Sequence, residues 1–232
     1  MRWMRVYPGK IIELQSDYLG RSSAWIVCPP GAIPAPGQYL KVHAPSITGE
    51  VLPATLFAAE ISAQGFRAAS PIPVEWLPGT DLRLWGPLGN GFRLDWNVRR
   101  LALAALEDPS RLMPLIAQSL ERGIDVTLCA DGPLPPLPAS VEVAPLNTLP
   151  EVLTWADFLA MDVPLLKLPG LGALLGLRSE QYLPCPAQVL IHTAMPCVGM
   201  AECGVCAVPT RRGWKLACQD GPVFDLNLLE WR

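Results

Sequence analysis

Four cysteines near the C-terminus have the spacing of a metal-cluster site. They follow the pattern Cys197-x5-Cys203-x2-Cys206-x11-Cys218. Iron–sulfur clusters are held by cysteine thiolates, and plant-type [2Fe–2S] sites have the spacing C-x4-C-x2-C with a distant fourth cysteine. The first gap in this chain is one residue longer. The pattern predicts a [2Fe–2S] cluster on these four residues.

The loop that carries the first three cysteines suits a negatively charged cluster. Gly199 and Gly204 allow tight turns and a close approach of the backbone. Backbone N–H groups in such a loop can point at the sulfur atoms. Glu202 is the one charged residue of this loop, and we expect it to face solvent.

The residues between the third and fourth cysteines predict a hairpin. Arg211–Trp214 has the composition of a turn, and Trp214–Ala217 is expected to be the return strand that delivers Cys218. Trp214 is expected to shield the metal from water, which would tune its reduction potential.

Two other uses of the cysteines stay open. Structural zinc also uses C-x2-C pairs, although only one such pair occurs here. Disulfides need an oxidising compartment, and the N-terminal residues 1–8 lack the apolar core of a secretory signal. We therefore expect a reducing, cytoplasmic location. Cys28, Cys129 and Cys185 lie among apolar residues and are expected to be buried.

Composition limits the partners. Half of the 232 residues are hydrophobic, which is enough for a sizeable core. The net charge of −3 without a basic run argues against nucleic acid. No apolar stretch reaches the roughly 18 residues of a membrane span, because Lys167 and Pro169 interrupt Leu165–Leu177. Only 17% of the residues are charged, which suggests a surface covered by a partner subunit.

The first hundred residues have the pattern of short strands separated by Pro/Gly turns. Such a pattern predicts an antiparallel barrel. The expected strands are Gly9–Leu14, Ser23–Cys28, Gln38–His43, Pro53–Ile61 and Asp81–Trp85.

The pattern changes after Arg99. The apolar run Leu101–Leu106 predicts a buried strand. Asp108 and Pro109 supply an N-cap and a first helical residue for a helix that extends to Glu121. Strands that alternate with helices predict a parallel sheet. The other expected elements are strands at Asp125–Ala130, Val141–Ala144, Phe158–Met161 and Ala187–Thr193, and a helix at Glu151–Ala156.

Domain order and motifs resemble a known family. A barrel, an α/β layer and a cysteine loop in this order are typical of ferredoxin-reductase-like proteins. The chain resembles the electron-transfer subunit of type B dihydroorotate dehydrogenase. The segments that carry the resemblance are Pro36–Leu40, Gly86–Phe92, Met195–Cys206 and Cys218–Phe224.

The resemblance implies a two-domain α+β or α/β fold. Residues 1–98 would form a flavin-domain-like antiparallel β-barrel, and residues 99–184 a small α/β layer derived from an NAD domain. Residues 185–232 would form the iron–sulfur segment. It also implies FAD and [2Fe–2S] cofactors, a heteromeric complex with a catalytic oxidoreductase subunit, and a place in pyrimidine biosynthesis.

The flavin motif of the family is altered here. The resemblance assigns five residues to the flavin: Pro36, Gly37, Gln38, Pro53 and Thr55. The family has an R-P-x-S motif, in which the arginine pairs with the flavin pyrophosphate. Thr55 can replace the serine hydroxyl, but Leu52 cannot replace a guanidinium that binds phosphate through two hydrogen bonds. The family's following G-x-G-T segment is also missing, so FAD stays open as a cofactor.

The nicotinamide-binding motif of the family is altered more than the flavin motif. The family has a glycine-rich loop that admits a diphosphate to a helix N-terminus, and the matching segment Glu107–Leu115 contains no glycine. Glu107 and Asp108 place negative charge where the phosphate would bind. We therefore expect no NAD(P) binding.

These observations predict an electron-transfer subunit that carries a [2Fe–2S] cluster. It would be an oxidoreductase component rather than a stand-alone catalyst, and no catalytic residue is assigned. It would relay electrons between a partner oxidoreductase and a flavin or another redox centre. The alternative is a non-catalytic scaffold or regulatory subunit with a structural metal site. His43 and His192, the only histidines, are expected to be structural.

Overall fold

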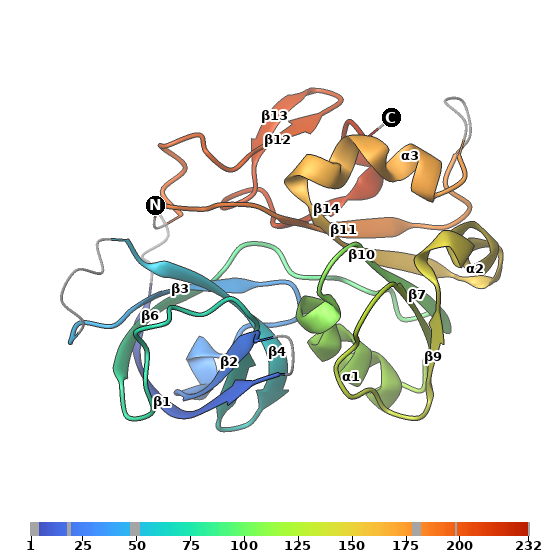
Figure 1. The fold of residues 1–232 in the computed structure, drawn as a ribbon. Coiled ribbons are helices and arrows are strands. Elements are labelled where there is room, and N and C mark those ends of the chain that lie inside the picture. The colour runs from blue at the N-terminus through green and yellow to red at the C-terminus, as the bar shows by residue number, and fades with distance from the viewer. Residues whose placement is uncertain (1–4, 18–19, 47–51, 178–181, 198, 232) are drawn as a thin grey trace.

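The computed structural model describes residues 5–17, 20–46, 52–177, 182–197 and 199–231. Residues 1–4, part of the segment examined for a secretory signal, lie outside the described residues. The described chain forms a barrel, a six-stranded sheet with helices, and a small hairpin (Figure 1). Within these ranges, no helix is both long and apolar enough to cross a membrane.

The barrel is closed and antiparallel, as predicted. Its strands follow the order β1-β2-β5-β4-β3-β6. They are β1 (Val6–Ser16), β2 (Ser22–Val27), β3 (Tyr39–His43), β4 (Ala54–Ser62), β5 (Gly65–Ala68) and β6 (Asp81–Leu88). Strand β5 was not predicted. A Cβ at Gly65 would lie 2.0 Å from the carbonyl oxygen of Ile26, so glycine lets β5 approach β2 closely.

The second sheet is parallel except at one edge. Its order is β14-β11-β10-β7-β8-β9, and only β14 runs antiparallel to its neighbour. The strands are β7 (Arg100–Ala105), β8 (Asp125–Ala130), β9 (Val141–Ala144), β10 (Phe158–Pro164), β11 (Ala187–His192) and β14 (Val223–Asp225). The predicted parallel sheet is confirmed, and β14 was not predicted. The domain limits at 98 and 184 stay a prediction, and β11 continues the sheet beyond the second of them.

Helices cover both faces of this sheet. Helix α1 (Met113–Glu121) packs Leu115 and Ile116 against one face, and α2 (Leu149–Trp155) and α3 (Leu171–Leu174) pack on the other. The described residues also form 3₁₀ helices at Pro30–Ala32, Pro109–Leu112, Leu146–Thr148, Leu165–Gly170 and Leu226–Leu228. The predicted cap before α1 is confirmed, because the Asp108 carboxylate accepts a hydrogen bond from the Ser110 N–H at 3.0 Å. The first turn after this cap is 3₁₀ rather than α-helical.

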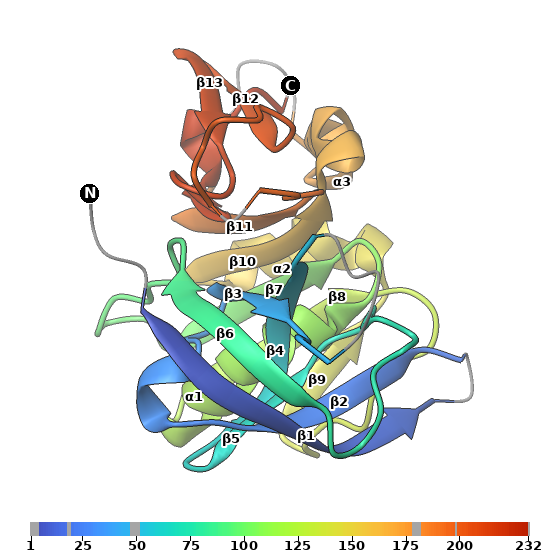
Figure 2. The ribbon, with the colours of Figure 1, turned by 90° about the vertical axis from the view of Figure 1, so that its left-hand side faces the viewer.

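The cysteine segment extends from the carboxyl end of β11. It includes the hairpin of β12 (Ala207–Thr210) and β13 (Gly213–Leu216), and the chain then returns to the sheet as β14. Figures 1 and 2 show the hairpin on the side of β11 and β14 that faces away from α1. The sheet edge therefore positions both ends of this segment.

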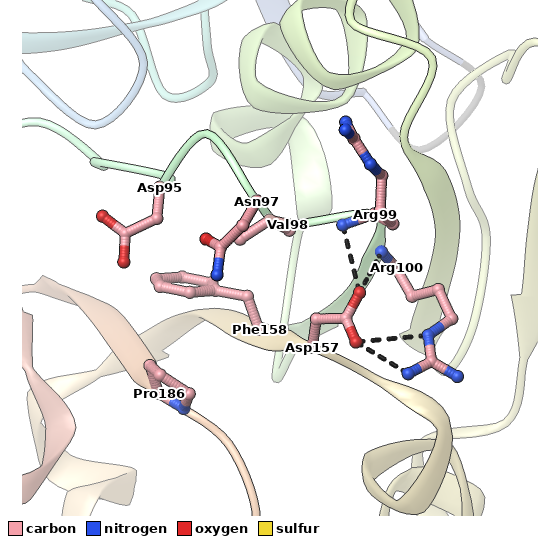
Figure 3. Close-up of a pocket in the computed structure, with 8 residues that line it drawn as sticks. All are labelled: Asp95, Asn97, Val98, Arg99, Arg100, Asp157, Phe158 and Pro186. Atoms are coloured by element: carbon pink, nitrogen blue, oxygen red, sulfur yellow. Dashed lines mark hydrogen bonds and ion pairs between the residues drawn. The ribbon is translucent and has the colours of Figure 1, made fainter.

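A hollow of about 470 Å³ lies at the amino ends of the central strands β7 and β10 (Figure 3). Asp157 in its wall accepts hydrogen bonds from the backbone N–H groups of Arg99 and Arg100 at 3.0 and 2.9 Å. The Arg100 guanidinium also donates to this carboxylate at 2.7 Å. Asp157 therefore joins the start of β10 to the start of β7, at the strand ends opposite to those from which the cysteine segment extends.

Candidate metal centre

The β12–β13 hairpin brings the third and fourth cysteines together. Thr210 pairs with Gly213 across the turn. At the open end of the hairpin, the Ala217 N–H donates to the carbonyl oxygen of Cys206 at 2.9 Å. Cys218 is therefore adjacent to Cys206. The predicted turn and return strand are confirmed.

The four thiols form two pairs. Cys206 and Cys218 are buried and share a hydrogen bond. Cys197 is half-buried, Cys203 is exposed, and their thiols share another. A binuclear cluster held by four cysteines takes two thiolates on each metal ion, so this donor set fits such a cluster. Among the described residues, no group of three or more His, Cys, Asp or Glu side chains was found that could hold one metal ion.

Backbone N–H groups stabilise negative charge on Cys197. Burial raises the pKa of this thiol, but the hydrogen bond from Cys203 opposes burial. The N–H groups of Gly199, Met200 and Ala201 act in the same direction as Cys203, and the pKa ends below its ordinary value. Gly199 and Ala201 have φ values of 76° and 62°, and such left-handed residues turn successive N–H groups toward an anion. The loop thus supplies the donors expected from its sequence.

Cys218 behaves in the opposite way. Burial, together with the neighbouring Cys206 and Cys197, raises the pKa of Cys218 to about 12. Thiolates are the form that binds metal, so deprotonation of Cys218 requires the positive charge of metal ions.

Two residues of β3 face the cysteine segment. Leu40 and Val42 point into the barrel core, while Tyr39 and Lys41 lie on the other face of the strand. The Tyr39 hydroxyl donates to the carbonyl oxygen of Cys218 at 2.9 Å. Sequence reasoning did not assign this contact to the metal site.

Lys41 is fully buried and is the second contact that the sequence did not reveal. Its Nζ donates to the carbonyl oxygen of Met195, to Thr55 Oγ1 at 2.7 Å and to the Pro53 carbonyl oxygen at 3.5 Å. Burial lowers the pKa of Lys41, and the four cysteines act in the opposite direction. The alternating pattern of β3 is the signal that places Lys41 on the same face as Tyr39.

Segments from the first hundred residues meet the C-terminal segment beside Cys218. The Asn90 side chain donates to the carbonyl oxygen of Asp220 at 2.7 Å, and the Asn90 N–H donates to that of Gly221 at 2.5 Å. Gln38 donates to the carbonyl oxygen of Gly89 at 3.1 Å. Three of the four segments that carried the sequence resemblance thus form one junction between the barrel and the cysteine segment.

Comparisons with known proteins agree with this site and fold. The family model described as "Iron-sulfur cluster binding domain of dihydroorotate dehydrogenase B" matches residues 192–230, a range that contains all four cysteines. The structure of an NADH-dependent reduced ferredoxin-NADP oxidoreductase aligns over 100% of this chain and 92% of its own, with a TM-score of 0.73 and 17% identity.

Residues 192–230 are thus similar to the iron–sulfur cluster binding domain of dihydroorotate dehydrogenase B, and the chain as a whole has a ferredoxin-reductase-like fold. An iron–sulfur cluster is the cofactor of that domain.

Other solved structures share the fold. An intact type IV self-sufficient cytochrome P450 monooxygenase aligns over 88% of this chain and 36% of its own, with a TM-score of 0.59 and 13% identity. The ferredoxin reductase in carbazole 1,9a-dioxygenase aligns over 75% and 64%, with a TM-score of 0.54 and 14% identity. At these identities the similarity shows the fold alone. Comparison with curated protein sequences gave no significant match.

The residues that the family resemblance assigns to flavin have partners within the chain. The carbonyl oxygen of Pro36 accepts from the Phe92 N–H at 2.9 Å, and Gln38 binds Gly89. Pro53 and Thr55 both accept from Lys41. A Cβ at Gly37, the fifth of them, would lie 2.6 Å from Val223.

Leu52 is exposed at the position of the family arginine and offers no phosphate contact. A leucine at this position does not fit a flavin pyrophosphate, and the assignment of the five residues to FAD stays a prediction.

The segment that replaces the dinucleotide loop is closed by an ion pair. Arg111 and Asp162 are both buried, with Nε and Oδ2 2.7 Å apart. Asp108 is also paired with Arg21 at 3.3 Å, so its carboxylate neutralises a cation of the chain itself. Burial lowers the pKa of the nearby His192 to about 4, which keeps this histidine neutral at pH 7.

The remaining sequence expectations for the site have mixed outcomes. Glu202 is exposed and Cys28, Cys129 and Cys185 are buried, as predicted. The prediction for Trp214 was wrong for the chain by itself, because 71% of this side chain is exposed. Its hairpin projects outward, and an exposed indole cannot keep water from the cysteines.

Proposed function

We propose that this chain is an electron-transfer subunit that holds a [2Fe–2S] cluster on Cys197, Cys203, Cys206 and Cys218. The observation that carries the proposal is the pairing of the four thiols within the segment that matches the iron–sulfur family. When bound, the cluster supplies one-electron redox chemistry. The residues of the chain hold the thiols in place, direct N–H groups at Cys197 and cover one thiol pair.

The uneven exposure of the two pairs supports transfer through one side of the centre. Cys206 and Cys218 are buried against the barrel, whereas Cys203 is exposed. Exposed apolar side chains accompany Cys203 on the same segment: Met200, Val205 and Trp214. Exposed apolar groups gathered on one part of a surface are typical of a docking site. We propose that a catalytic oxidoreductase subunit binds here and supplies the flavin or other redox centre.

The family name points to dihydroorotate oxidation, and hence to pyrimidine biosynthesis, as the reaction of that partner. Purification of the native complex, followed by identification of its subunits and released flavin, tests this part of the proposal. A partner without dihydroorotate dehydrogenase activity would contradict it.

Single alanine variants of the four cysteines test the ligand assignment. Each is expected to lose iron, visible absorbance and the EPR signal that appears after dithionite reduction of anaerobically purified protein. Cys28→Ala and Cys185→Ala are matched controls, because both thiols are buried and lie outside the set. They are expected to keep the wild-type spectrum. Wild-type protein that contains zinc and gives no EPR signal would favour the scaffold alternative.

A further inference from the structure

Lys41 is a buried cation whose described hydrogen-bond partners are neutral. Two are backbone carbonyl oxygens, of Pro53 and Met195, and the third is the Thr55 hydroxyl. Three acceptors match the three N–H donors of an ammonium group. A buried charge is costly unless an opposite charge lies near it, so the source of negative charge around Lys41 matters.

The cysteine segment would supply that negative charge once its four thiolates hold the cluster. The four cysteines favour the charged form of Lys41. Met195, which accepts from Lys41, is two residues before Cys197. Tyr39, on the same face of β3, binds the carbonyl oxygen of Cys218. The side chains of β3 thus reach both ends of the cysteine segment, and Lys41 brings a positive charge to its buried side.

We propose that Lys41 is a positioning residue that raises the reduction potential of the iron–sulfur cluster. This inference rests on the proposed function, in which the four cysteines hold the cluster. One-electron reduction adds one negative charge to the cluster, and the net charge around a cluster is one of the factors that set its potential. A fixed ammonium group in a low-dielectric interior stabilises the added charge more than a solvated lysine would.

The central test is an EPR-monitored redox titration of Lys41→Met under anaerobic conditions. Methionine keeps the length and apolar stem of the side chain and removes the charge. We expect the equilibrium constant for one-electron reduction to fall at least tenfold, which is a shift of about 59 mV to lower potential.

Two lysine variants serve as matched controls for loss of a single charge. Lys10 lies on β1 and is 56% exposed beside Asp81. Lys215 lies on β13, between Cys206 and Cys218 in the sequence, and is also 56% exposed. Solvent screens both charges. Lys10→Met is expected to leave the potential unchanged, and Lys215→Met to change it less than Lys41→Met.

The titration separates failure of this inference from failure of the proposed function. Wild-type protein without iron or a reducible EPR signal would overturn the proposed function and this inference with it. An unchanged potential in a Lys41→Met protein that holds wild-type iron would overturn only the role of Lys41.

Two further measurements apply if Lys41→Met does not fold. Lys41→Gln keeps a donor for the carbonyl oxygens and removes the charge, and the same tenfold fall is expected. In wild-type protein labelled with ¹⁵N-lysine, pulsed EPR of the reduced cluster should detect a nearby lysine nitrogen. Absence of this coupling would overturn the proposal without any variant.

Discussion

The hydroxyl of Tyr39 donates a hydrogen bond to the backbone carbonyl oxygen of Cys218 across 2.9 Å. These residues are 179 positions apart in the sequence, and the bond joins the barrel directly to the fourth cysteine. Burial and the neighbouring Cys218 raise the pKa of Tyr39, so it stays a neutral donor at physiological pH. The stability of the cysteine segment therefore depends on the barrel.

Tyr39→Phe tests this dependence. The change leaves a buried carbonyl oxygen without its donor, which is expected to lower the free energy of unfolding by about 1–3 kcal/mol. The visible absorbance should also decay faster during exposure to an iron chelator. Urea unfolding measures the first effect and absorbance the second. Tyr182→Phe, at a side chain that is 88% exposed, should change neither.

Gly89→Ala tests the junction between the barrel and the cysteine segment. Gly89 has φ 73°, and a Cβ there would lie 2.5 Å from Pro222 Cδ and 2.6 Å from the carbonyl oxygen of Gly221. Gly79→Ala is the matched control, since Gly79 has φ 93° and no atom within 4 Å of its Cβ position. Both variants incur left-handed strain of about 1–2 kcal/mol. Gly89→Ala should lose about 1–3 kcal/mol more through overpacking, measured by urea unfolding. Equal losses would argue against a tight junction.

The buried ion pair of Arg111 and Asp162 is expected to affect the free energy of unfolding. Asp162→Asn leaves the buried guanidinium unpaired and should cost about 3–5 kcal/mol of unfolding free energy. The double variant Arg111→Met/Asp162→Leu removes both charges and should recover most of this loss. Denaturant unfolding of the single and double variants checks the order. A double variant as unstable as Asp162→Asn would show that the pair contributes through packing rather than charge.

Asp157 predicts a pH dependence at the amino ends of the central strands β7 and β10. The Arg100 hydrogen bond, helped by the N–H group of Arg99, lowers the pKa of Asp157 to about 2, whereas an unfolded aspartate titrates near about 3.9. The unfolded chain therefore binds more protons between these values. The stabilisation is complete above about pH 4 and is lost as the pH falls toward 2.

Asp157→Asn checks this window. Wild type should be more stable than the variant at pH 7, and the difference should shrink from pH 4 to pH 3. Tryptophan fluorescence during guanidinium unfolding measures the difference at each pH, so that effects common to both proteins cancel. A difference that does not depend on pH would contradict the lowered pKa.

Local sequence patterns were sufficient for most elements. Short strand-like segments between Pro/Gly turns identified five of the barrel strands, and an unbroken apolar run identified β7. The Asp108-Pro109 pair marked the start of its helix. These signals depend on neighbours in the sequence, and the structure agrees with them. Strands β5 and β14 were missed because segments of three or four residues carry too little pattern, and their pairing is decided by distant partners.

In the candidate site, too, features set by nearby residues could be predicted, whereas contacts between distant residues could not. Cysteine spacing and the hairpin could be predicted because all four thiols come from one short segment. The contributions of Tyr39, Lys41 and Asn90 could not, because their contacts with that segment span 130 residues or more. A lysine within a strand is ordinarily solvated, and only the folded chain shows that Lys41 is buried.

The return of the chain as β14 limits how this protein could be dissected. Residues 192–230 match a family model by themselves. However, β14 is an edge strand that pairs with β11 of the main sheet, and the link between β11 and β14 is hydrogen-bonded to Asn90 and Tyr39. Expressed alone, this fragment would lose β11 as the pairing partner of β14, and it would lose the hydrogen-bond donors Tyr39 and Asn90. We therefore expect that residues 192–230 do not fold as an independent domain. A fusion of this segment to another protein would also need the parts of the chain that carry Tyr39 and Asn90.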